Sequence, residues 1–300
     1  RVIRGLVVAA LATCICLASV SAASAQRPDC TGRGVPDSKI SIQLWTFAEY
    51  IGFGTDAATI ARTEEVFRRL SEMGYRNVEP FTLSGLTAEQ YRALLDKYGL
   101  KASGRHVNVG TPESPVDFDQ ILAENKILGI KYFGSGGTPN YATEAEWIAY
   151  AQYLTELGAR ARQAGQTLMV HNHNWEFQRV FGDRTAFDIL MEHTDARNVV
   201  FQLDLYWATN GGGIGNPVEV LERYGNRIQL FHVKDMAAGP FPGRIEIVGE
   251  GIIDFPEIFA TSKGPIRYYV VEHDPRFEDP TFDPFEAAQK GFDYLECVTF

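Results

Sequence analysis

Four short stretches of this sequence place imidazole and carboxylate side chains directly after an apolar run. In chain order they are residues 171–176 (HNHNWE), 203–207 (LDLYW), 231–235 (FHVKD) and 271–274 (VEHD). A carboxylate at the end of an apolar segment, such as Asp204 or Glu272, must be paired, hydrogen-bonded or bound to a metal, because burying it alone is costly. We therefore expect the four stretches to meet around one divalent metal ion.

Three residues, Asp204, His232 and Glu272, are the first candidates for metal ligands, and one group between His171 and Glu176 would add a fourth. A mixed set of imidazole and carboxylate suits Mn²⁺, Zn²⁺, Co²⁺ or Fe²⁺, with water or substrate completing the shell. No thiolate is suitably placed in the sequence, so a structural zinc site is not expected.

The expected metal indicates a particular chemistry. A cation held in this way binds two adjacent oxygens of a hydroxy-ketone and polarises the carbonyl, so that the neighbouring carbon can lose a proton. A general base takes this proton, and a second acid/base on the other face allows epimerisation. Glu272 is one candidate for these roles, and Glu176, His173 or His171 is the other.

Strand and helix patterns alternate eight times, which defines the elements that position these residues. The predicted strands are 39–46, 75–80, 100–107, 130–134, 167–171, 199–204, 227–232 and 266–273. The predicted helices are 56–73, 87–98, 117–128, 143–164, 184–194, 217–224, 255–262 and 284–297. Such alternation implies parallel strands joined by crossover helices. Eight units favour an α/β fold of the (β/α)₈ TIM barrel type, as a single domain over residues 39–300. A doubly wound sheet is the competitor, but no G-x-G-x-x-G follows the first strand.

The positions of the histidines support a barrel site, because such sites lie at the carboxyl ends of the strands. Five of the six histidines fall at predicted strand ends: His106, His171, His173, His232 and His273. Any one of them could simply satisfy a buried backbone group, but that explanation is poor for all five together.

Composition narrows the function classes. The 300 residues are 45% hydrophobic, and the formal net charge is −10. An acidic surface repels a phosphate backbone, so we do not expect a nucleic-acid partner. The composition does not indicate an oligomeric state.

The first 25 residues read as a secretory signal peptide. Arg1 and Arg4 precede an apolar stretch over residues 6–20, and Ala23-Ser24-Ala25 has the small-x-small cleavage pattern. The mature protein would then be secreted or periplasmic, with no membrane segment. Residues 26–38 would form an N-terminal linker. Cys30 and Cys297 could form a disulfide in an oxidising compartment, although the sequence cannot place them within bonding range.

Five motifs together resemble the xylose isomerase-like TIM barrel superfamily, in the branch of sugar phosphate isomerases and epimerases. They are HNHNWEF at 171–177, LDLYW at 203–207, HVKD at 232–235, VGEGIIDF at 248–255 and VVEH at 270–273, and the resemblance spans about residues 40–295. The resemblance implies one divalent metal, often Mn²⁺, held by Glu, Asp, His and Glu. Asp204, His232 and Glu272 correspond to three of these ligands. Many relatives carry Glu-Asn-His where this chain has His171-Asn172-His173, so His171 is the expected fourth ligand, with Glu176 in reserve.

A second departure from the family pattern concerns the reaction. Ketose epimerases have a histidine three residues after the aspartate, where this chain has Trp207. This difference weighs against a plain ketose 3-epimerase. The family also contains dehydratases and lyases that act on inososes and 3-keto sugars through the same enolate chemistry. For an exported enzyme, a keto sugar or keto-glycoside is a more credible substrate than a sugar phosphate.

We expect several residues at the strand ends to contact the substrate: Trp45, Glu79, His106, Asn108, Trp207 and Lys234. Lys234 follows His232 by two residues and could steady an oxyanion, or instead pair with Asp235 or Glu250. The glycine-rich stretch 210–216 reads as a flexible lid or only a long turn, and residues 244–254 as a segment that closes over the substrate.

The leading hypothesis is a metal-dependent isomerase or epimerase of a small keto sugar. The second is a lyase or dehydratase that performs β-elimination on a keto sugar or 3-keto-glycoside. A non-catalytic sugar-binding protein on the same barrel is the third. An abasic-site endonuclease would need more metal ligands and a basic groove, and the sequence shows neither.

Overall fold

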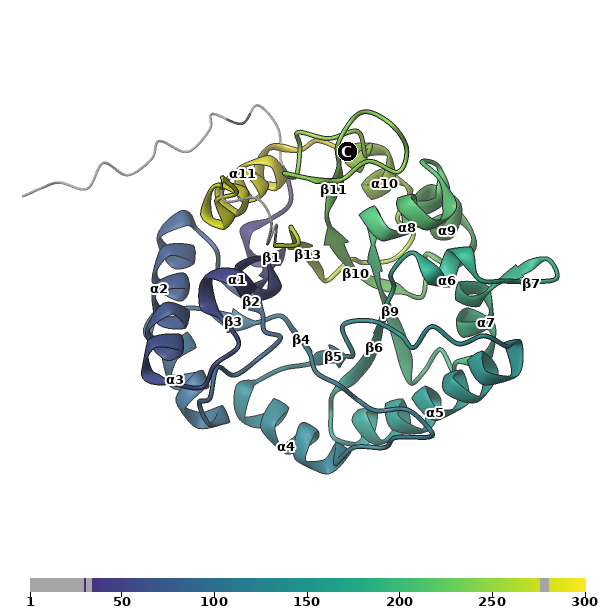
Figure 1. Cartoon of the computed structure of the whole chain (residues 1–300), viewed down its shortest axis with the longest axis horizontal. Helices are drawn as coiled ribbons and strands as arrows, with labels where there is room; N and C mark the ends of the chain where they lie inside the picture. The colour runs from purple at the N-terminus through teal and green to yellow at the C-terminus, as the bar shows by residue number, and fades with distance from the viewer. Residues whose placement is uncertain (1–29, 31–33, 276–280) are drawn as a thin grey trace, which may run out of the picture.

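The fold is a (β/α)₈ barrel in which a ring of helices surrounds a closed parallel sheet (Figure 1). The computed structural model describes residues 30, 34–275 and 281–300. The sheet order is β3-β2-β1-β13-β10-β9-β6-β5-β4, and every neighbouring pair is parallel. Its strands are β1 (Ile40–Gln43), β2 (Asn77–Glu79), β3 (Lys101–Ala102), β4 (Gly104–His106), β5 (Tyr132–Gly134), β6 (Thr167–His171), β9 (Val199–Asp204), β10 (Ile228–Val233) and β13 (Tyr268–Val271).

The third strand position is divided into two pieces. The strands β3 and β4 lie on either side of Ser103, and they stand at the two ends of the sheet order. Because β3 pairs with β2 and β4 pairs with β5, this divided strand closes the ring. The result is eight strand positions, as the sequence predicts, and their carboxyl ends lie on one rim.

The eight predicted helices are confirmed, with ends that differ by at most two residues. They are α2 (Ala57–Met73), α3 (Ala88–Lys97), α4 (Phe118–Leu128), α5 (Glu144–Gln163), α7 (Ala186–His193), α9 (Asn216–Tyr224), α10 (Phe255–Thr261) and α11 (Pro284–Cys297). Local signals set these ends. Thr87 and Thr143 form capping boxes with the glutamine or glutamate three residues later. Gly74 ends α2 at φ 116°, a conformation that favours glycine. One connected hydrophobic core joins the helices to the sheet.

The predictions for the loops above the barrel were less accurate. The first strand ends at Gln43, where we expected Thr46, and the 3₁₀ helix η2 (Leu44–Phe47) and the short helix α1 (Ala48–Ile51) follow. The Gln43 side chain accepts a hydrogen bond from Trp45 N, which starts this turn. The expected lid at 210–216 is wrong in its first half, because α8 (Leu205–Gly212) includes it. The short helix α6 (Trp175–Gln178) was also not predicted.

Two small hairpins lie outside the barrel sheet. One joins β7 (Val180–Phe181) to β8 (Arg184–Thr185), and the other joins β11 (Asp235–Met236) to β12 (Ile245–Glu246). The Asp235 carboxylate anchors the second by accepting hydrogen bonds from the backbone N–H groups of Met236, Gly249, Gly251 and Ile253. The segment expected to close over the substrate is therefore bonded to the end of β10.

The two ends of the domain meet beside α11. Val35 is buried, and its N–H donates to Leu295 O at 2.8 Å, so part of the expected linker packs against the barrel. A disulfide joins Cys30 to Cys297, with 5.0 Å between their Cα atoms. The expected signal peptide (1–25) lies outside the described residues. Within the described part of the chain, no helix has the length and apolarity needed to cross a bilayer.

Candidate metal centre

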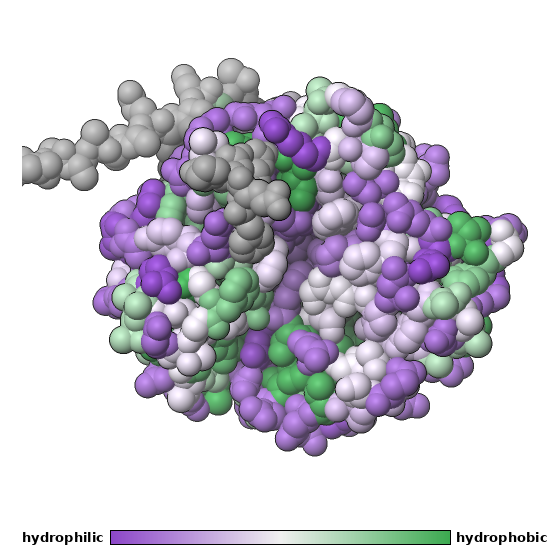
Figure 2. Space-filling model, viewed as in Figure 1, coloured by the Kyte–Doolittle hydropathy of each residue, from purple (hydrophilic) through white to green (hydrophobic). Residues whose placement is uncertain are grey.

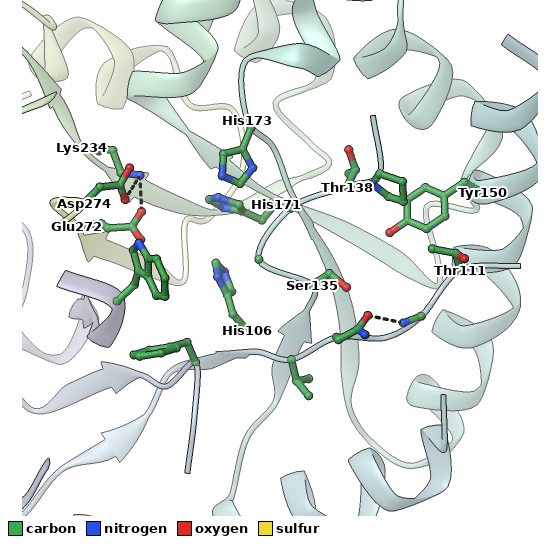
Figure 3. A pocket seen from close by; sticks show the side chains of 18 residues that line it. His106, Thr111, Ser135, Thr138, Tyr150, His171, His173, Lys234, Glu272 and Asp274 are labelled. Carbon is green, nitrogen blue, oxygen red and sulfur yellow. Dashed lines mark hydrogen bonds and ion pairs between the residues drawn. The ribbon is translucent and has the colours of Figure 1, made fainter. Parts of the chain in front are cut away.

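A cavity of about 570 Å³ opens at the carboxyl ends of the strands. The face drawn in Figure 1 is hollowed near its centre in the space-filling view (Figure 2). Figure 3 shows the cavity from close by, with Lys234, Glu272 and Asp274 at one end, and Thr111, Thr138 and Tyr150 at the other. The imidazoles of His106, His171 and His173 lie between these ends.

The predicted ligands Asp204, His232 and Glu272 converge. They come from the end of β9, from β10 and from the residue after β13, and one donor atom from each lies within 4.8 Å of the others. His232 Nδ1 lies 2.8 Å from Glu272 Oε2 and 3.8 Å from Asp204 Oδ2. Asp204 and His232 are 0% exposed, and Glu272 is 4% exposed. Neighbouring parallel strands bring these side chains together, as the strand-end argument predicts.

One oxygen of Asp204 is left without a hydrogen bond. Asp204 Oδ1 accepts from Trp207 N at 2.8 Å and so caps α8. Its buried partner Oδ2 accepts no hydrogen bond from any described residue, although Lys234 Nζ lies 3.3 Å away. A buried carboxylate oxygen without a hydrogen bond is costly, and a divalent cation would satisfy it. The donor set of two carboxylates and one imidazole also fits such a cation.

Lys234 is a buried cation among three carboxylates. Its Nζ lies 2.8 Å from Glu272 Oε2 and 3.0 Å from Asp274 Oδ1, besides its contact with Asp204. These carboxylates raise the pKa of Lys234 although burial alone lowers it, so the ammonium stays charged. The alternative pairing with Asp235 or Glu250 is wrong, since Asp235 bonds the hairpin backbone and Glu250 pairs with Lys290.

Glu79 lies behind His232 and outside the cavity lining that the described residues form. It is 0% exposed, and Oε1 accepts from His232 Nε2 and from Gln43 Nε2, each at 2.7 Å. The expected substrate contact is therefore corrected: Glu79 fixes the ring of His232 and leaves Nδ1 facing Asp204 and Glu272. A carboxylate behind a ligating histidine is a common device for orienting the ring. Gly104 permits the approach, because a Cβ there would lie 2.6 Å from Glu79 Oε2.

Gln202 orients the rings of two more histidines, His106 and His171, through hydrogen bonds. Its Nε2 donates to Glu79 Oε2 at 2.8 Å, so its carbonyl oxygen is the atom that accepts from His106 Nε2 at 2.8 Å and His171 Nδ1 at 3.2 Å. A carbonyl oxygen can only accept, so each of these ring nitrogens carries a proton. The neutral form of His171 therefore presents the lone pair of Nε2.

His171 and Glu176 are the two candidates for a fourth ligand, and they lie in different surroundings. His171 forms a second group with His106 and His232, whose donor atoms also lie within 4.8 Å of one another. Its ring centroid is 4.5 Å from that of His232. Glu176, the reserve ligand, has both oxygens in hydrogen bonds, from Thr138 Oγ1 at 2.5 Å and from His173 N at 2.8 Å. It lies behind the cavity wall, which also does not support its expected role as a catalytic base.

Burial and neighbouring charges together set the protonation states of the side chains at this centre. Burial raises the pKa of Asp204 to about 6, against the lowering effect of Lys234. The pKa of His232 rises to about 10, because Glu272 and Glu79 outweigh its burial. Burial lowers the pKa of His173 to about 3, and that of His171 well below its usual range, so both rings are neutral.

The remaining expected contacts divide into two groups. Trp45, His106, Asn108, His173 and Lys234 line the cavity, and Trp207 is not among its described lining residues. The Trp207 ring centroid lies 5.3 Å from Lys234 Nζ and 5.3 Å from the ring centroid of His173. Trp207 therefore packs beside Lys234 and His173, which themselves line the cavity.

Sequence reasoning missed several residues of the centre: Gln43, Ser135, Thr138, Tyr150, Gln202 and Asp274. Gln202 had a readable signal, because it is polar, stands in an otherwise apolar strand and precedes Asp204 by two positions. Residues two apart in a strand share a face. Ser135, Thr138 and Tyr150 had no such signal, since loops and a helix bring them to the cavity.

A family model described as xylose isomerase-like TIM barrel matches residues 67–296. An inosose dehydratase from Clostridium beijerinckii is 30% identical over 179 residues, which cover 53% of this chain and 57% of that enzyme. The chain thus spans little more than half the length of this relative. A sugar phosphate isomerase/epimerase from Parabacteroides distasonis has a similar structure, with a TM-score of 0.71 at 23% identity over 88% of this chain and 96% of that one. A structure of the IolI protein with a bound zinc atom has a TM-score of 0.61 at 18% identity, over 84% and 95%. These structural likenesses concern the fold alone.

Proposed function

Because the chain belongs to the xylose isomerase-like TIM barrel family, we propose that it is a divalent-metal-dependent enzyme that removes a proton beside the carbonyl of a small sugar. The observation that carries this proposal is the convergence of Asp204, His232 and Glu272 around a carboxylate oxygen that accepts no hydrogen bond from the described residues. The cavity beside them carries polar and aromatic side chains suited to a sugar.

Asp204, His232 and Glu272 would hold the cation, with His171 as the proposed fourth ligand. We propose Mn²⁺ for this site, and Zn²⁺, Co²⁺ or Fe²⁺ could replace it, since mixed imidazole and carboxylate ligands accept all four. When bound, the cation would supply Lewis acidity to the carbonyl of the substrate.

The protein side chains would then handle charge and protons. The Lys234 ammonium lies at the cavity wall and would stabilise negative charge that develops on the carbonyl oxygen. Glu272 lines the cavity and is the proposed acceptor of the proton. It is kept ionised because Lys234 and His232 outweigh its burial and lower its pKa. The neutral imidazole of His173 is the proposed second proton carrier.

The side chains that line the cavity favour β-elimination as the reaction. We therefore place the lyase or dehydratase hypothesis before the isomerase or epimerase hypothesis. Of the cavity-lining residues in the described chain, Glu272 and Asp274 carry the carboxylates, and both follow β13. Elimination needs one base for the carbon-bound proton and one acid for the departing oxygen. In that step Glu272 would take the proton of the C–H bond, whose electrons form the new double bond. The C–O bond breaks, and the departing oxygen takes its proton from an N–H group of His173, the proposed second proton carrier. The dehydratase relative adds support to this choice.

Epimerisation is the second candidate, and one observation favours it. His171 and His173 line the cavity beside Glu272 and come from another strand end, so a proton could be returned from a different direction. Epimerisation requires such a donor on the opposite face of the carbon.

Proton NMR in D₂O tests the proposal. The protein is stripped with a chelator, reloaded with Mn²⁺, and incubated with a 3-keto-glycoside, with the Mn²⁺ removed before spectra are recorded. We expect release of the aglycone that stops with the chelator and returns with the metal. Deuterium incorporation and changed configuration without release would indicate the epimerase. Sugar binding that survives the chelator, without any exchange, would leave only a binding protein.

We also propose that the enzyme is exported, because residues 1–25 have the pattern of a cleaved signal. Fractionation of cells that express the full chain tests this. Mature protein beginning near Gln26 outside the cytoplasm is expected, and uncleaved cytoplasmic protein would contradict export.

A further inference from the structure

The cavity continues well beyond the metal centre. Its volume of about 570 Å³ lies within the range of roughly 300–1,000 Å³ that holds drug-sized ligands, and one sugar ring at the metal would leave part of it open. The end away from Lys234 is lined by Thr111, Ser135, Thr138 and Tyr150 (Figure 3). Asn108 also lines the cavity and adjoins Val109, whose N–H donates to Ser135 Oγ. We call these five residues the distal subsite. The proposed proton transfer uses none of these residues.

Three side chains of the distal subsite carry groups that can form hydrogen bonds with a ligand. The Tyr150 residue is only 2% exposed and lines the cavity, and its hydroxyl can both donate and accept a hydrogen bond. Asn108 Oδ1 accepts from Gly110 N, which leaves its amide N–H groups to donate. Ser135 Oγ accepts from Val109 N, which leaves the hydroxyl proton to donate. Polar groups that line a cavity can bond a ligand that enters it, so these three side chains suit a polar ligand.

The distal subsite carries no formal charge. The charged side chains of the cavity lining are Lys234, Glu272 and Asp274, all at the metal end and already in contact with one another. Burial raises the pKa of Tyr150, so its hydroxyl stays protonated. Phosphate recognition uses arginine, lysine or several backbone N–H groups, and the described lining has no such side chain to spare. A neutral group rich in hydroxyls fits better.

The glycines of the loop after β5 have a packing explanation. A Cβ on Gly136 would lie 3.0 Å from His106 Nδ1, and a Cβ on Gly137 would lie 2.8 Å from His173 Cε1. Both glycines are needed where the loop passes close to the two imidazoles. Their presence therefore does not require a phosphate.

We infer, resting on the proposed function, that the distal subsite binds the second ring of a neutral keto-glycoside whose keto-sugar ring lies at the metal centre. The substrate class would then be a disaccharide or a similar glycoside, rather than a free monosaccharide or a sugar phosphate. In the elimination, the ring held by the distal subsite is the leaving group, and it departs as an alcohol.

Turnover of matched substrates tests the inference. We would measure kcat/KM of the metal-loaded protein for a keto-disaccharide, the corresponding keto-monosaccharide and its phosphate, with Tyr150→Phe and Ser135→Ala as variants. A neutral hydrogen bond contributes about 0.5–1.5 kcal/mol, so each variant should lose about 2- to 12-fold on the disaccharide. The loss on the monosaccharide should be smaller. Equal losses on both, or a preference for the phosphate, would overturn the inference.

Tyr98→Phe is the matched control. Tyr98 donates its hydroxyl to Glu64 on the outer surface and is not among the described cavity-lining residues, so this variant should behave like the wild type on every substrate. Circular dichroism and thermal melting check the fold of each variant. If Tyr150→Phe does not fold, Ser135→Ala and Asn108→Ala decide the question.

Binding without reaction separates this inference from the proposed function. An unoxidised disaccharide has no ketone and cannot react, so calorimetry reports its affinity alone. If it binds more tightly than the monosaccharide and Tyr150→Phe removes that gain, the subsite stands even when no substrate turns over. If keto sugars turn over but the second ring adds neither affinity nor rate, the subsite is rejected and the proposed function is retained.

Discussion

Two buried carboxylates, Glu79 behind His232 and Glu176 in α6, differ in charge although both are 0% exposed. Glu79 accepts hydrogen bonds from His232, Gln43 and Gln202, and the imidazoles of His106 and His232 outweigh burial and lower its pKa. Glu176 accepts from Thr138 and from the backbone of His173, and burial raises its pKa to about 7.

The comparison shows that burial alone does not set the charge of a carboxylate here. Glu79 keeps its charge because cationic and N–H donors surround it, and it can therefore orient His232 as a fixed anion. Among the described residues, burial and hydrogen bonds rather than a cation set the pKa of Glu176, so it changes protonation near neutral pH. The charge of Glu79 therefore stays fixed near neutral pH, whereas the charge of Glu176 in α6 changes with pH.

The largest expected effect on activity comes from preventing binding of the proposed cation beside His232. Asp204→Ala should abolish metal binding and lower kcat/KM by at least about 10³-fold, which is about 4 kcal/mol of transition-state stabilisation. The fold should persist, because the surrounding core is unchanged. Elemental analysis and turnover measure the two effects.

Asp119→Ala is the control for this variant, since Asp119 is exposed and pairs with Arg160 on the surface. It should retain the metal and the activity of the wild type. A metal-to-chain ratio near one in Asp204→Ala, with full activity, would refute the proposed centre.

A smaller effect should follow from neutralising the carboxylate beneath the site. Glu79→Gln keeps the size of the side chain but removes the charge that holds the His232 ring. Substitution of such a partner costs about 10- to 100-fold in metal affinity, and calorimetric titration with Mn²⁺ measures it. Glu72→Gln, at an exposed surface pair with Arg68, is the matched control. An unchanged affinity in Glu79→Gln would mean that the metal ligands are oriented without this anion.

The sequence was sufficient to predict the barrel and the convergence of Asp204, His232 and Glu272, the three proposed ligands. Strand and helix periods are local, and capping residues such as Thr143 mark the helix ends directly. A site at Asp204 and Glu272 could be predicted because an ionised group at the end of an apolar strand requires a partner wherever the strand lies.

The roles of Glu79 and Glu176 could not be predicted in the same way. Both are single carboxylates near strand ends, and their difference depends on neighbours that are distant in the sequence. His232 approaches Glu79 across 153 positions, and Thr138 approaches Glu176 across 38. Short connections raised a similar difficulty: residues 205–212 are rich in glycine and asparagine near their end, yet Asp204 caps them as α8.

The third expected effect concerns the stability of the fold rather than the reaction, through its dependence on pH. The pKa of Glu176 is about 7 in the folded chain against 4.5 as its ordinary value. A raised pKa means that the folded state binds the proton more tightly, so this group stabilises the fold fully below pH 4.5 and loses that contribution as the pH rises through 7. The shift of about 2.5 units corresponds to up to about 3 kcal/mol.

Glu176→Gln should remove this dependence. Urea unfolding of the metal-free protein between pH 4.5 and 8 should show the wild type losing up to about 3 kcal/mol more than the variant. Both proteins contain the same histidines, so the difference between the two curves isolates Glu176. Parallel curves would show that Glu176 is ionised throughout, as Glu79 is, and that its hydrogen bonds from Thr138 and His173 suffice to hold the charge without a neighbouring cation.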